Sequence, residues 1–475
     1  MKKSNVAYDL EGHKYNLLAF VLVLLFGSFT MSISQSSMST AYPTMMKSFG
    51  ISASTVQWLT TGLMIVMCVM MPASPWLLNN VKFKRLFIGI LLTFDVGTLI
   101  IFIAPNFLTV IVGRTLEAIA MGVLFPSFQS VLLYITPEKR RGSIMGLAGL
   151  VLGSALACGP VVSGIILNFT SGWRGLFMFF MVVITIMLIL SLFTIKDVMP
   201  YKKSHLDILS IVYSIGLIGI LYVINIAGKI GKQNVNLTVI GLILIVSLVL
   251  MGLFIHRQFH LKQPLLNLRV MKVFNYDLAI GLTCFSYIAL IVNTIIFPLY
   301  YQDVLGASKL VSGLAMAPGA IFLSILNPYT GHLTGTIGFK KTMLIGMTMI
   351  CAGGLVLSIV PAGMGLIATM LITAVIKGGN AFVMMPSVTM GANSLPKNLI
   401  SHGTALITTM RQILGSVAVV VATLILTNVT SSNSVLGRMV AQLHGFKAVF
   451  ITFFILEVIG MIMALMIKNP KQATK

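Results

Sequence analysis

The sequence predicts an all-α polytopic membrane protein, and two observations support this prediction. The 475 residues are 57% hydrophobic and only 9% charged, whereas a soluble domain carries about a quarter charged residues. The apolar residues also fall into runs of about 20 residues, the length with which a helix crosses the hydrocarbon core of a bilayer. Together these features exclude a soluble domain and favour a bundle of membrane-spanning helices.

Fourteen apolar runs follow one another along the chain. They cover residues 16–35, 54–78, 86–104, 107–130, 144–167, 174–195, 206–227, 236–256, 277–301, 310–333, 342–360, 364–387, 404–427 and 447–467. The first run is too long for a signal peptide and lacks a small-residue cleavage site, so we expect it to be the first span. The segments between runs are short, so the whole chain is expected to form one membrane unit.

The distribution of basic residues predicts the orientation of these spans. If both termini face the cytoplasm, 22 of the 32 Lys and Arg residues lie in cytoplasmic segments and seven lie outside. Cytoplasmic loops of membrane proteins are enriched in Lys and Arg, so this arrangement is favoured. It also accounts for the net charge of +22 without a nucleic-acid partner. The remaining three cations lie within spans: Arg114, Lys377 and Arg411.

The sequence contains no pattern typical of an enzyme. We find no Walker-type phosphate loop, no HExxH motif and no credible catalytic triad, so neither ATP-driven transport nor hydrolysis is expected. No cofactor and no metal site are expected either. The four cysteines lie in apolar runs without disulfide or metal-ligand spacing and are expected to be small core residues: Cys68, Cys158, Cys284 and Cys351.

Two cytoplasmic hairpins resemble each other and indicate an internal repeat. Residues 71–87 (MPASPWLLNNVKFKRLF) and 327–343 (NPYTGHLTGTIGFKKTM) follow the second and tenth runs. This placement predicts two six-helix bundles, 1–200 and 261–475, with two extra transmembrane helices in 201–260 between them. Parallel repeats of this kind are common in transporters, where the halves rock around a central site. The alternative is that any short cytoplasmic turn is basic.

Six motifs, in this order and at these spacings, resemble one known family. They are QWLTTGLMIVMCVMMPAS (57–74), GRTLEAIAMG (113–122), GLVLGSALACGPVVSG (149–164), GWRGLFMF (172–179), YYQDVLGASKLVSGLAMAPGA (300–320) and GTALITTMRQILG (403–415). The chain resembles the fourteen-span drug:proton antiporters of the major facilitator superfamily, a group that contains quaternary-ammonium and multidrug exporters. The resemblance implies the major facilitator fold and a monomer in the cytoplasmic membrane. It also implies small-molecule efflux coupled to protons.

The fifth run is unusually rich in small residues. Along it, positions at spacings of three or four form a stripe on one helix face, namely Gly149, Gly153, Ala157, Pro160 and Gly164. Such stripes let two helices approach closely in a bilayer, and Pro160 is expected to bend the helix. We therefore predict a tightly packed gate helix between the halves, with Gly153 and Gly159 at close contacts. The alternative is ordinary tight packing without a gating role.

The usual proton-binding residue of this family is missing. Aligned backwards from Pro43, Ser34 stands where the family has a first-span aspartate. Glu117 follows Arg114 by three positions and shares its helix face, so a partner and a desolvated site would act on its pKa in opposite directions. We predict that this pair carries the proton, and the alternative is a static ion pair. Weaker candidates for the same role are Asp95 and Glu457.

Several polar, aromatic or cationic side chains within spans are candidates for the wall of a central cavity. They are Ser34, Gln57, Trp58, Phe125, Gln129, Tyr287, Asn293, Lys377 and Arg411. The leading interpretation is a secondary exporter of hydrophobic or cationic drug-like compounds, driven by proton entry. Two alternatives stay open. The same fold could carry an anionic or zwitterionic metabolite or lipid, or the chain could be a membrane sensor or scaffold that transports nothing.

Overall fold

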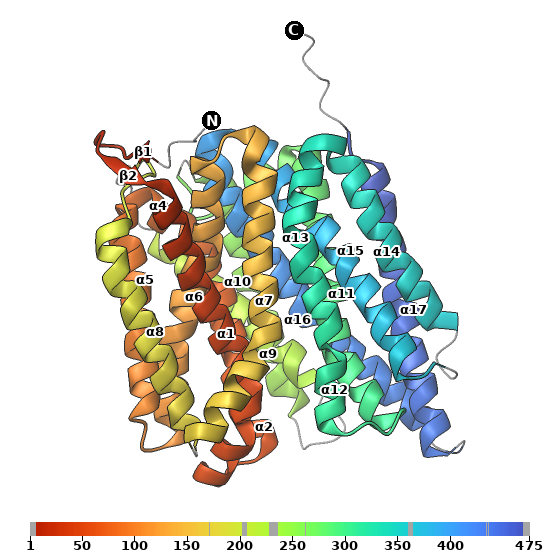
Figure 1. Ribbon diagram of the computed structural model, residues 1–475. Coiled ribbons are helices and arrows are strands. Elements are labelled where there is room, and N and C mark those ends of the chain that lie inside the picture. The colour runs from red at the N-terminus through yellow and green to blue at the C-terminus, as the bar shows by residue number, and fades with distance from the viewer. Residues whose placement is uncertain are drawn as a thin grey trace.

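The protein is described by a computed structural model that covers residues 6–170, 172–201, 207–227, 236–261, 263–359, 364–433, 435 and 437–468. Apart from one short hairpin, the regular structure in these residues is helical (Figure 1). In that hairpin β1 (Val6–Tyr8) pairs antiparallel with β2 (Lys14–Asn16), so that Ala7 lies opposite Tyr15. The prediction of an all-α polytopic chain is thereby confirmed.

The first group of helices corresponds to the first six predicted runs. It comprises α1 (Leu17–Phe49), α2 (Ala53–Val56), α3 (Trp58–Met70), η1 (Met71–Ala73), α4 (Ser74–Asn80), α5 (Phe83–Phe102), α6 (Phe107–Ile135), α7 (Glu138–Thr170) and α8 (Trp173–Thr194). The second run is divided into short pieces, with Pro72 and Pro75 near the starts of η1 and α4. Proline lacks the backbone N–H that a continuous helix needs, which accounts for the interruption.

The remaining helices follow the last eight predicted runs. They are α9 (Ile208–Ala227), α10 (Leu237–His260), η2 (Leu268–Lys272), α11 (Phe274–Asp303), α12 (Lys309–Ala315), α13 (Ala317–Ile337), α14 (Phe339–Ile359), α15 (Leu366–Asn393), η3 (Lys397–Leu399), α16 (Ile400–Ser432) and α17 (Arg438–Leu465). Here α12 and α13 together occupy the tenth run.

Asparagine side chains cap the start of three of these helices. The Asn16 side chain accepts hydrogen bonds from the first turn of α1, Asn106 from that of α6, and Asn236 from that of α10. A cap of this kind satisfies backbone N–H groups that have no partner inside the helix. These three helices therefore begin directly after an asparagine.

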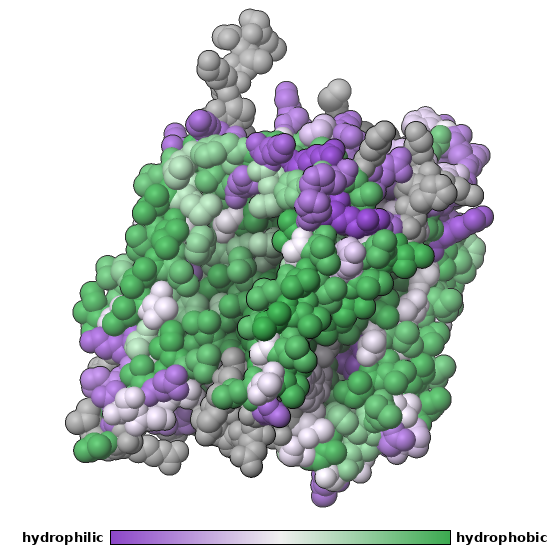
Figure 2. Space-filling view, turned by 180° about the vertical axis from the view of Figure 1, so that it is seen from behind, coloured by the Kyte–Doolittle hydropathy of each residue, from purple (hydrophilic) through white to green (hydrophobic). Residues whose placement is uncertain are grey.

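The outer surface matches a bilayer. Thirteen helices in the described residues are long and apolar enough to cross a membrane. The run predicted over 206–227 falls on α9, in which the apolar stretch Ile208–Ile224 is shorter. Figure 2 shows apolar residues over most of the molecular flank, between two edges where hydrophilic residues gather. The fourteen-span count stays a prediction.

The helices form two groups, each with a core of its own. Helices α1 to α8 lie on one side of Figure 1 and α11 to α17 on the other. The first core contains Phe20, Phe87, Phe94, Met121 and Phe128, and the second contains Phe297, Tyr300, Tyr301, Val449 and Phe450. The extra pair, α9 and α10, pack against each other, and α9 also contacts α3 of the first group and α16 of the second.

The ends of the described chain identify two edges of the molecule. The hairpin of β1 and β2 and the end of α17 lie at the same edge (Figure 1), which we call the terminus side. Helices α3 and α17 begin at the other edge, which we call the opposite side. Because successive long helices alternate in direction, α7, α11 and α16 begin on the terminus side and α13 and α15 end there.

Candidate functional site: a pocket between the two halves

A pocket with a volume of about 300 Å³ lies between the two groups of helices. Its walls come from the opposite-side parts of α1, α3 and α9 and from the middle and opposite-side parts of α11 and α16. The residues that line it are Tyr42, Gln57, Thr60, Thr61, Met64, Ile65, Leu221, Ile224, Tyr287, Ile291, Ile295, Gln412, Gly415, Ser416, Val419 and Val420. None of these described lining residues is charged.

The second-half wall is built from residues at helical spacing. Tyr287, Ile291 and Ile295 recur every four residues of α11 and therefore share one face. The hydroxyl of Tyr287 donates a hydrogen bond to Oε1 of Gln412 on α16, at 3.1 Å. This bond places a polar group at the inner end of a largely apolar wall.

The first-half wall is more polar. The hydroxyls of Tyr42 on α1 and Thr60 on α3 are hydrogen-bonded to each other, and Gln57 and Thr61 line the pocket beside them. Few polar groups on a mainly apolar surface are typical of small-molecule sites, where they fix orientation. The pocket can therefore hold an amphipathic molecule by apolar contact and a few hydrogen bonds.

On the terminus side the two halves are in direct contact along α7 and α13. A Cβ atom added to Gly142 would lie 2.5 Å from the carbonyl oxygen of Gly331, and one added to Gly146 would lie 2.5 Å from that of Asn327. Only glycine allows backbones to approach this closely. We call this contact, made by Gly142, Gly146, Asn327 and Gly331, the glycine seam.

Hydrogen bonds join the halves near the glycine seam. Nη1 of Arg141 on α7 donates to Oδ1 of Asn393 on α15, at 2.8 Å. The hydroxyls of Ser130 on α6 and Thr404 on α16 also form a hydrogen bond. The halves are thus held together in the terminus half of the molecule, whereas the pocket lies between them in the opposite half.

The small residues predicted for the fifth span divide into two sets. A Cβ atom added to Gly149 would clash with Asn327 of α13, and one added to Gly153 would lie 3.2 Å from Oγ of Ser324 on the same helix. These two glycines therefore face the other half. Gly142 and Gly146 lie upstream of the predicted stripe, which starts at Gly149, and the sequence analysis did not predict their role.

Three others lie elsewhere, and the side chain of Ala157 is outside the described part of the chain. Gly159 packs against Ser36 of α1, inside the first half. Pro160 is exposed, and no atom lies within 4 Å of a Cβ added to Gly164. The opposite-side part of α7 therefore contacts its own half rather than α13.

Arg114 and Glu117 form an ion pair that is almost completely buried, 2.5 Å between Nη1 and Oε2. The hydroxyl of Thr98 on α5 donates to the other carboxylate oxygen at 2.8 Å. Nε of Arg114 donates to the carbonyl of Leu59 on α3 at 3.4 Å. Glu117 does not line the pocket, but Leu59 precedes the pocket residue Thr60, so the pair lies one layer behind the wall.

The two weaker acidic candidates are placed differently. Asp95, half-buried on α5, accepts a hydrogen bond from Thr185 of α8 at 2.9 Å, away from the pocket. Glu457 on α17 is 3% exposed, and neither carboxylate oxygen has a hydrogen-bond partner. It lines a cavity of about 30 Å³ together with Asn293 of α11, in the interior of the second half.

Of the nine predicted wall residues, Gln57 and Tyr287 line the pocket. Ser34, Phe125 and Gln129 are buried and line none of the described cavities, and the side-chain oxygen of Ser34 and both polar atoms of Gln129 have no partner. Asn293 lies beside Glu457.

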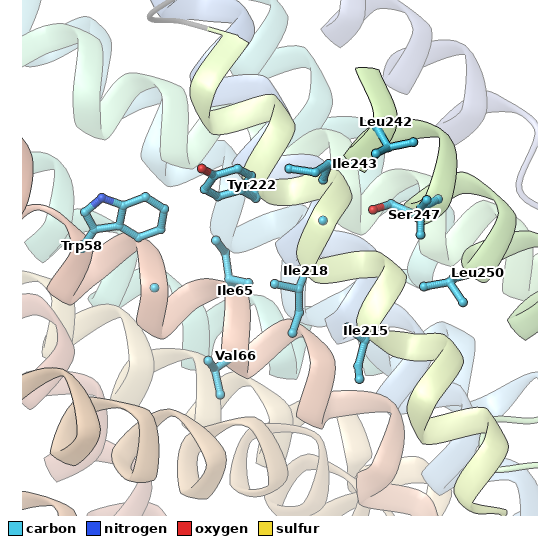
Figure 3. Close-up of a pocket in the computed structure, with 13 residues that line it drawn as sticks. Trp58, Ile65, Val66, Ile215, Ile218, Tyr222, Leu242, Ile243, Ser247 and Leu250 are labelled. Atoms are coloured by element: carbon cyan, nitrogen blue, oxygen red, sulfur yellow. The ribbon is translucent and has the colours of Figure 1, made fainter. Parts of the chain in front are cut away.

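Trp58 lines a different space, an apolar groove of about 600 Å³ between α3, α9 and α10. Its ring stacks on that of Tyr222, with ring centroids 6.0 Å apart (Figure 3). Ile65 of α3 borders both this groove and the pocket. Helix α9 contributes residues to both spaces and separates them.

The remaining two predicted wall residues are the buried cations of the second half. Lys377 on α15 packs its alkyl chain close to Gly319 of α13. Arg411 on α16 is 7% exposed, and its guanidinium lies over the ring of Tyr287 at 5.2 Å. Nε and Nη1 of Arg411 have no hydrogen-bond partner.

Comparison with known proteins agrees with this architecture. Residues 24–419 match the family described as the Major Facilitator Superfamily. The uncharacterized MFS-type transporter YcnB of Bacillus subtilis is 31% identical over 465 residues, 98% of each chain. The lincomycin resistance protein LmrB of Listeria monocytogenes is 30% identical over 470 residues, 97% of this chain and 98% of LmrB.

A solved structure shows the same fold. The human organic anion transporter MFSD10 (TETRAN) superposes with a TM-score of 0.66 at 11% identity, over 94% of this chain and 99% of that one. At this identity the likeness concerns the fold alone. Two groups of helices, a pocket between them and a family match over most of the sequence lead to one conclusion: the chain belongs to the Major Facilitator Superfamily and is a membrane transporter, not an enzyme.

Proposed function

We propose that this transporter exports hydrophobic drug-like compounds across the cytoplasmic membrane, driven by proton entry. The observation that carries the proposal is the uncharged, largely apolar pocket between the halves. The name of the Listeria relative, a lincomycin resistance protein, supports export of a drug-like cargo. The partners in this proposal are the small molecule, protons and the lipid bilayer, and the active unit is a monomer.

The distribution of basic residues indicates toward which side of the membrane the pocket lies. The terminus side carries most of the Lys and Arg residues, and cytoplasmic loops are enriched in these residues. We therefore assign the terminus side to the cytoplasm. In this state the glycine seam closes the cytoplasmic half, and the pocket lies in the outer half, as in a transporter about to release its cargo outside.

Transport then requires the glycine seam to separate. The halves would rock about the pocket, so that α7 leaves α13 on the cytoplasmic side while the outer ends close. The pair α9 and α10 lies between the halves in sequence. We propose that it is an insertion in which α9 completes one corner of the pocket through Leu221 and Ile224.

We assign the proton step to Glu117 with Arg114. Arg114 of this pair donates a hydrogen bond to the carbonyl of Leu59. The next residue, Thr60, lines the pocket, and its hydroxyl is hydrogen-bonded to that of Tyr42. A cargo that shifts α3 would alter the Arg114 contact, and loss of that partner favours protonation of a buried carboxylate. Asp95 and Glu457 are the alternative proton carriers.

Reconstitution in proteoliposomes tests this function. A pH gradient should drive accumulation of a hydrophobic test compound, and a protonophore should abolish it. Cationic, neutral and anionic compounds of similar hydrophobicity should be compared, first by counterflow and then under the gradient. Absence of both counterflow and gradient-driven flux for every compound would favour the sensor or scaffold interpretation instead.

A further inference from the structure

Arg411 is a buried cation without a counter-ion. It is 7% exposed, and its only described close partner is the ring of Tyr287. Within the described residues no carboxylate forms an ion pair with it, whereas the buried Arg114 has Glu117. Removing a charge from water is costly unless the charge is paired and hydrogen-bonded. Arg411 is therefore a site at which an additional negative group would be strongly stabilised.

The guanidinium does not line the pocket itself but lies directly behind the part of the wall that Tyr287 and Gln412 form. Tyr287, on which it stacks, and Gln412, the next residue along α16, both line the pocket. The guanidinium lies over the Tyr287 ring, 5.2 Å from its centroid, and an arginine carries five N–H donors. Nε and Nη1 are fully buried and lack partners, so a carboxylate reaches these donors only when the Tyr287 and Gln412 side chains move aside. Arginine binds carboxylates best through two such donors.

The rest of the pocket fits the body of an amphipathic anion. Ile291, Ile295, Val419 and Val420 line its outer part with apolar surface. None of the described lining residues is acidic, so nothing there would repel a negative group or attract a positive one. An uncompensated arginine behind such a wall also raises the cost of placing a cation in the pocket.

We infer that Arg411 is the recognition site for a carboxylate on an amphipathic cargo, with Tyr287 and Gln412 as its polar neighbours. The carboxylate binds the guanidinium edge and the apolar body occupies the outer pocket. This inference rests on the proposed function, because it names the charge of the compound that the same pocket takes. It favours the anionic alternative over a cationic drug.

A binding experiment without any gradient tests the site. Dansylglycine, dansylglycinamide and dansylethylenediamine share one apolar body and differ only in carrying an anionic, a neutral or a cationic end. Fluorescence titration of the purified protein in nanodiscs should give a Kd for dansylglycine at least tenfold lower than for the other two. Equal affinities, or tighter binding of the amine, would overturn the inference with the wild-type protein alone.

Variants then show which residue causes the preference for dansylglycine. Arg411→Gln should remove the tenfold preference while changing the Kd of dansylglycinamide less than twofold. Arg411→Lys, which keeps the charge but loses the planar donors, should retain part of it. Lys377→Gln is the matched control, because it removes a buried cation that packs beside Gly319 of α13 rather than over a pocket residue. A preference that survives Arg411→Gln, or that disappears in Lys377→Gln, would place the anion elsewhere.

The outcome is separable from that of the transport assay. If dansylglycine binds with the expected preference but no gradient-driven flux occurs, the recognition site stands and the proposed export fails. If flux occurs only for neutral and cationic compounds and Arg411→Gln leaves it unchanged, export stands and the inference fails.

Discussion

At the scale of single residues, the molecule treats its buried charges in two ways. Glu117 has a bond to each carboxylate oxygen, from Arg114 and from Thr98, so this carboxylate is satisfied while the helices stay as they are, although Nη2 of Arg114 has no partner. Glu457 has no partner at either carboxylate oxygen, and Arg411 has none at Nε and Nη1. A carboxylate that is bonded at both oxygens resists change until its helices move, whereas an unsatisfied group responds directly to a ligand or a proton.

The first residue-scale prediction concerns Glu117→Gln. Glutamine keeps the shape but cannot release a proton, so transport driven by a pH gradient should fall by at least tenfold. Cargo exchange without a gradient should stay within about twofold. Both rates can be measured in the same proteoliposomes, with Glu138→Gln, an exposed carboxylate at the start of α7, as control. Arg114→Ala should be more damaging, because it leaves Glu117 buried without its cation.

Normal pumping by Glu117→Gln would move the proton step to Asp95 or Glu457, each of which can be tested by the same substitution. Failure of the variant to insert or fold would instead support the static ion pair. The two results are distinguished by size-exclusion profiles of the purified protein.

At the scale of elements, α7 serves two neighbours along its length. Its terminus-side part faces α13 through Gly142, Gly146 and Gly149, and its opposite-side part faces α1 through Gly159. Ser36 and Ser37 of α1 donate hydrogen bonds to carbonyl oxygens of α7. The contact with α1 is therefore fixed by hydrogen bonds, whereas the contact with α13 depends on close backbone approach.

We expect Gly146→Leu to prevent the glycine seam from closing. Overpacking a close interface costs about 1–3 kcal/mol, which shifts the equilibrium between states by roughly 5- to 150-fold. Export should fall while the amount of inserted protein is unchanged. Gly164→Leu lies on the same helix with no neighbour within 4 Å and should transport normally. Equal transport by the two variants would contradict a gating role for the glycine seam.

Gly153 and Gly159, the two close contacts predicted from the sequence, are expected to behave differently from each other when substituted. Gly153→Leu, which faces Ser324 of α13, should also impair alternation, but less than Gly146→Leu because its neighbours leave more space. Gly159→Leu should lower thermal stability instead, since Ser36 lies within the same half. Melting curves and transport rates of both variants separate these effects.

The pair α9 and α10 has its own connection at the terminus side. Arg257 on α10 donates to both carboxylate oxygens of Asp207, at 2.8 and 2.9 Å, and Gln258 donates to Ser210 at 2.6 Å. The ion pair is partly exposed, so we expect a coupling free energy of about 0.5–1 kcal/mol. A double-mutant cycle of Asp207→Asn and Arg257→Gln, followed by thermal unfolding, measures it. Additive effects of the two substitutions would show that the pair contributes nothing.

At the scale of the whole molecule, the apolar runs predicted the helices well. The clearest difference is α1, which was predicted over 16–35 but extends to Phe49. Its second part is rich in Ser and Thr and does not look like a span. Inside the bundle these hydroxyls bond to backbone carbonyls, both within α1 and on α7, which satisfies their polarity where water is absent.

The pocket could be predicted only in part. Gln57 and Tyr287 were recognised as polar groups inside apolar runs, but Gln412, Ser416 and Thr60 were not, because their role depends on which helices lie side by side. The partner of the small-residue stripe was missed for the same reason: Gly331 and Asn327 are distant in sequence from α7. A single sequence specifies which face of a helix is smooth or polar, but not which helix meets that face.

The orientation of the protein in the membrane and the side to which its pocket opens can be tested together. We expect Ser416→Cys, in a background without the four native cysteines, to react with a membrane-impermeant maleimide added from outside right-side-out vesicles. Thr334→Cys, buried at the terminus-side end of α13 near Gly142, should react slowly from either side. Faster labelling of position 334 from inside than of position 416 from outside would indicate the reverse orientation or a resting state open to the cytoplasm.

The glycine seam has a further consequence for how sharply the transporter changes state. Where long side chains meet, an interface can loosen by degrees, because rotamers adjust as the distance grows. Gly142 and Gly331 have no side chains, and their contact is backbone against backbone. Dispersion attraction falls steeply with distance, so a separation of about an ångström already forfeits much of it. The closed and open forms should therefore interconvert as an all-or-none switch, with few molecules held part-way and little opportunity for protons to leak through both gates at once.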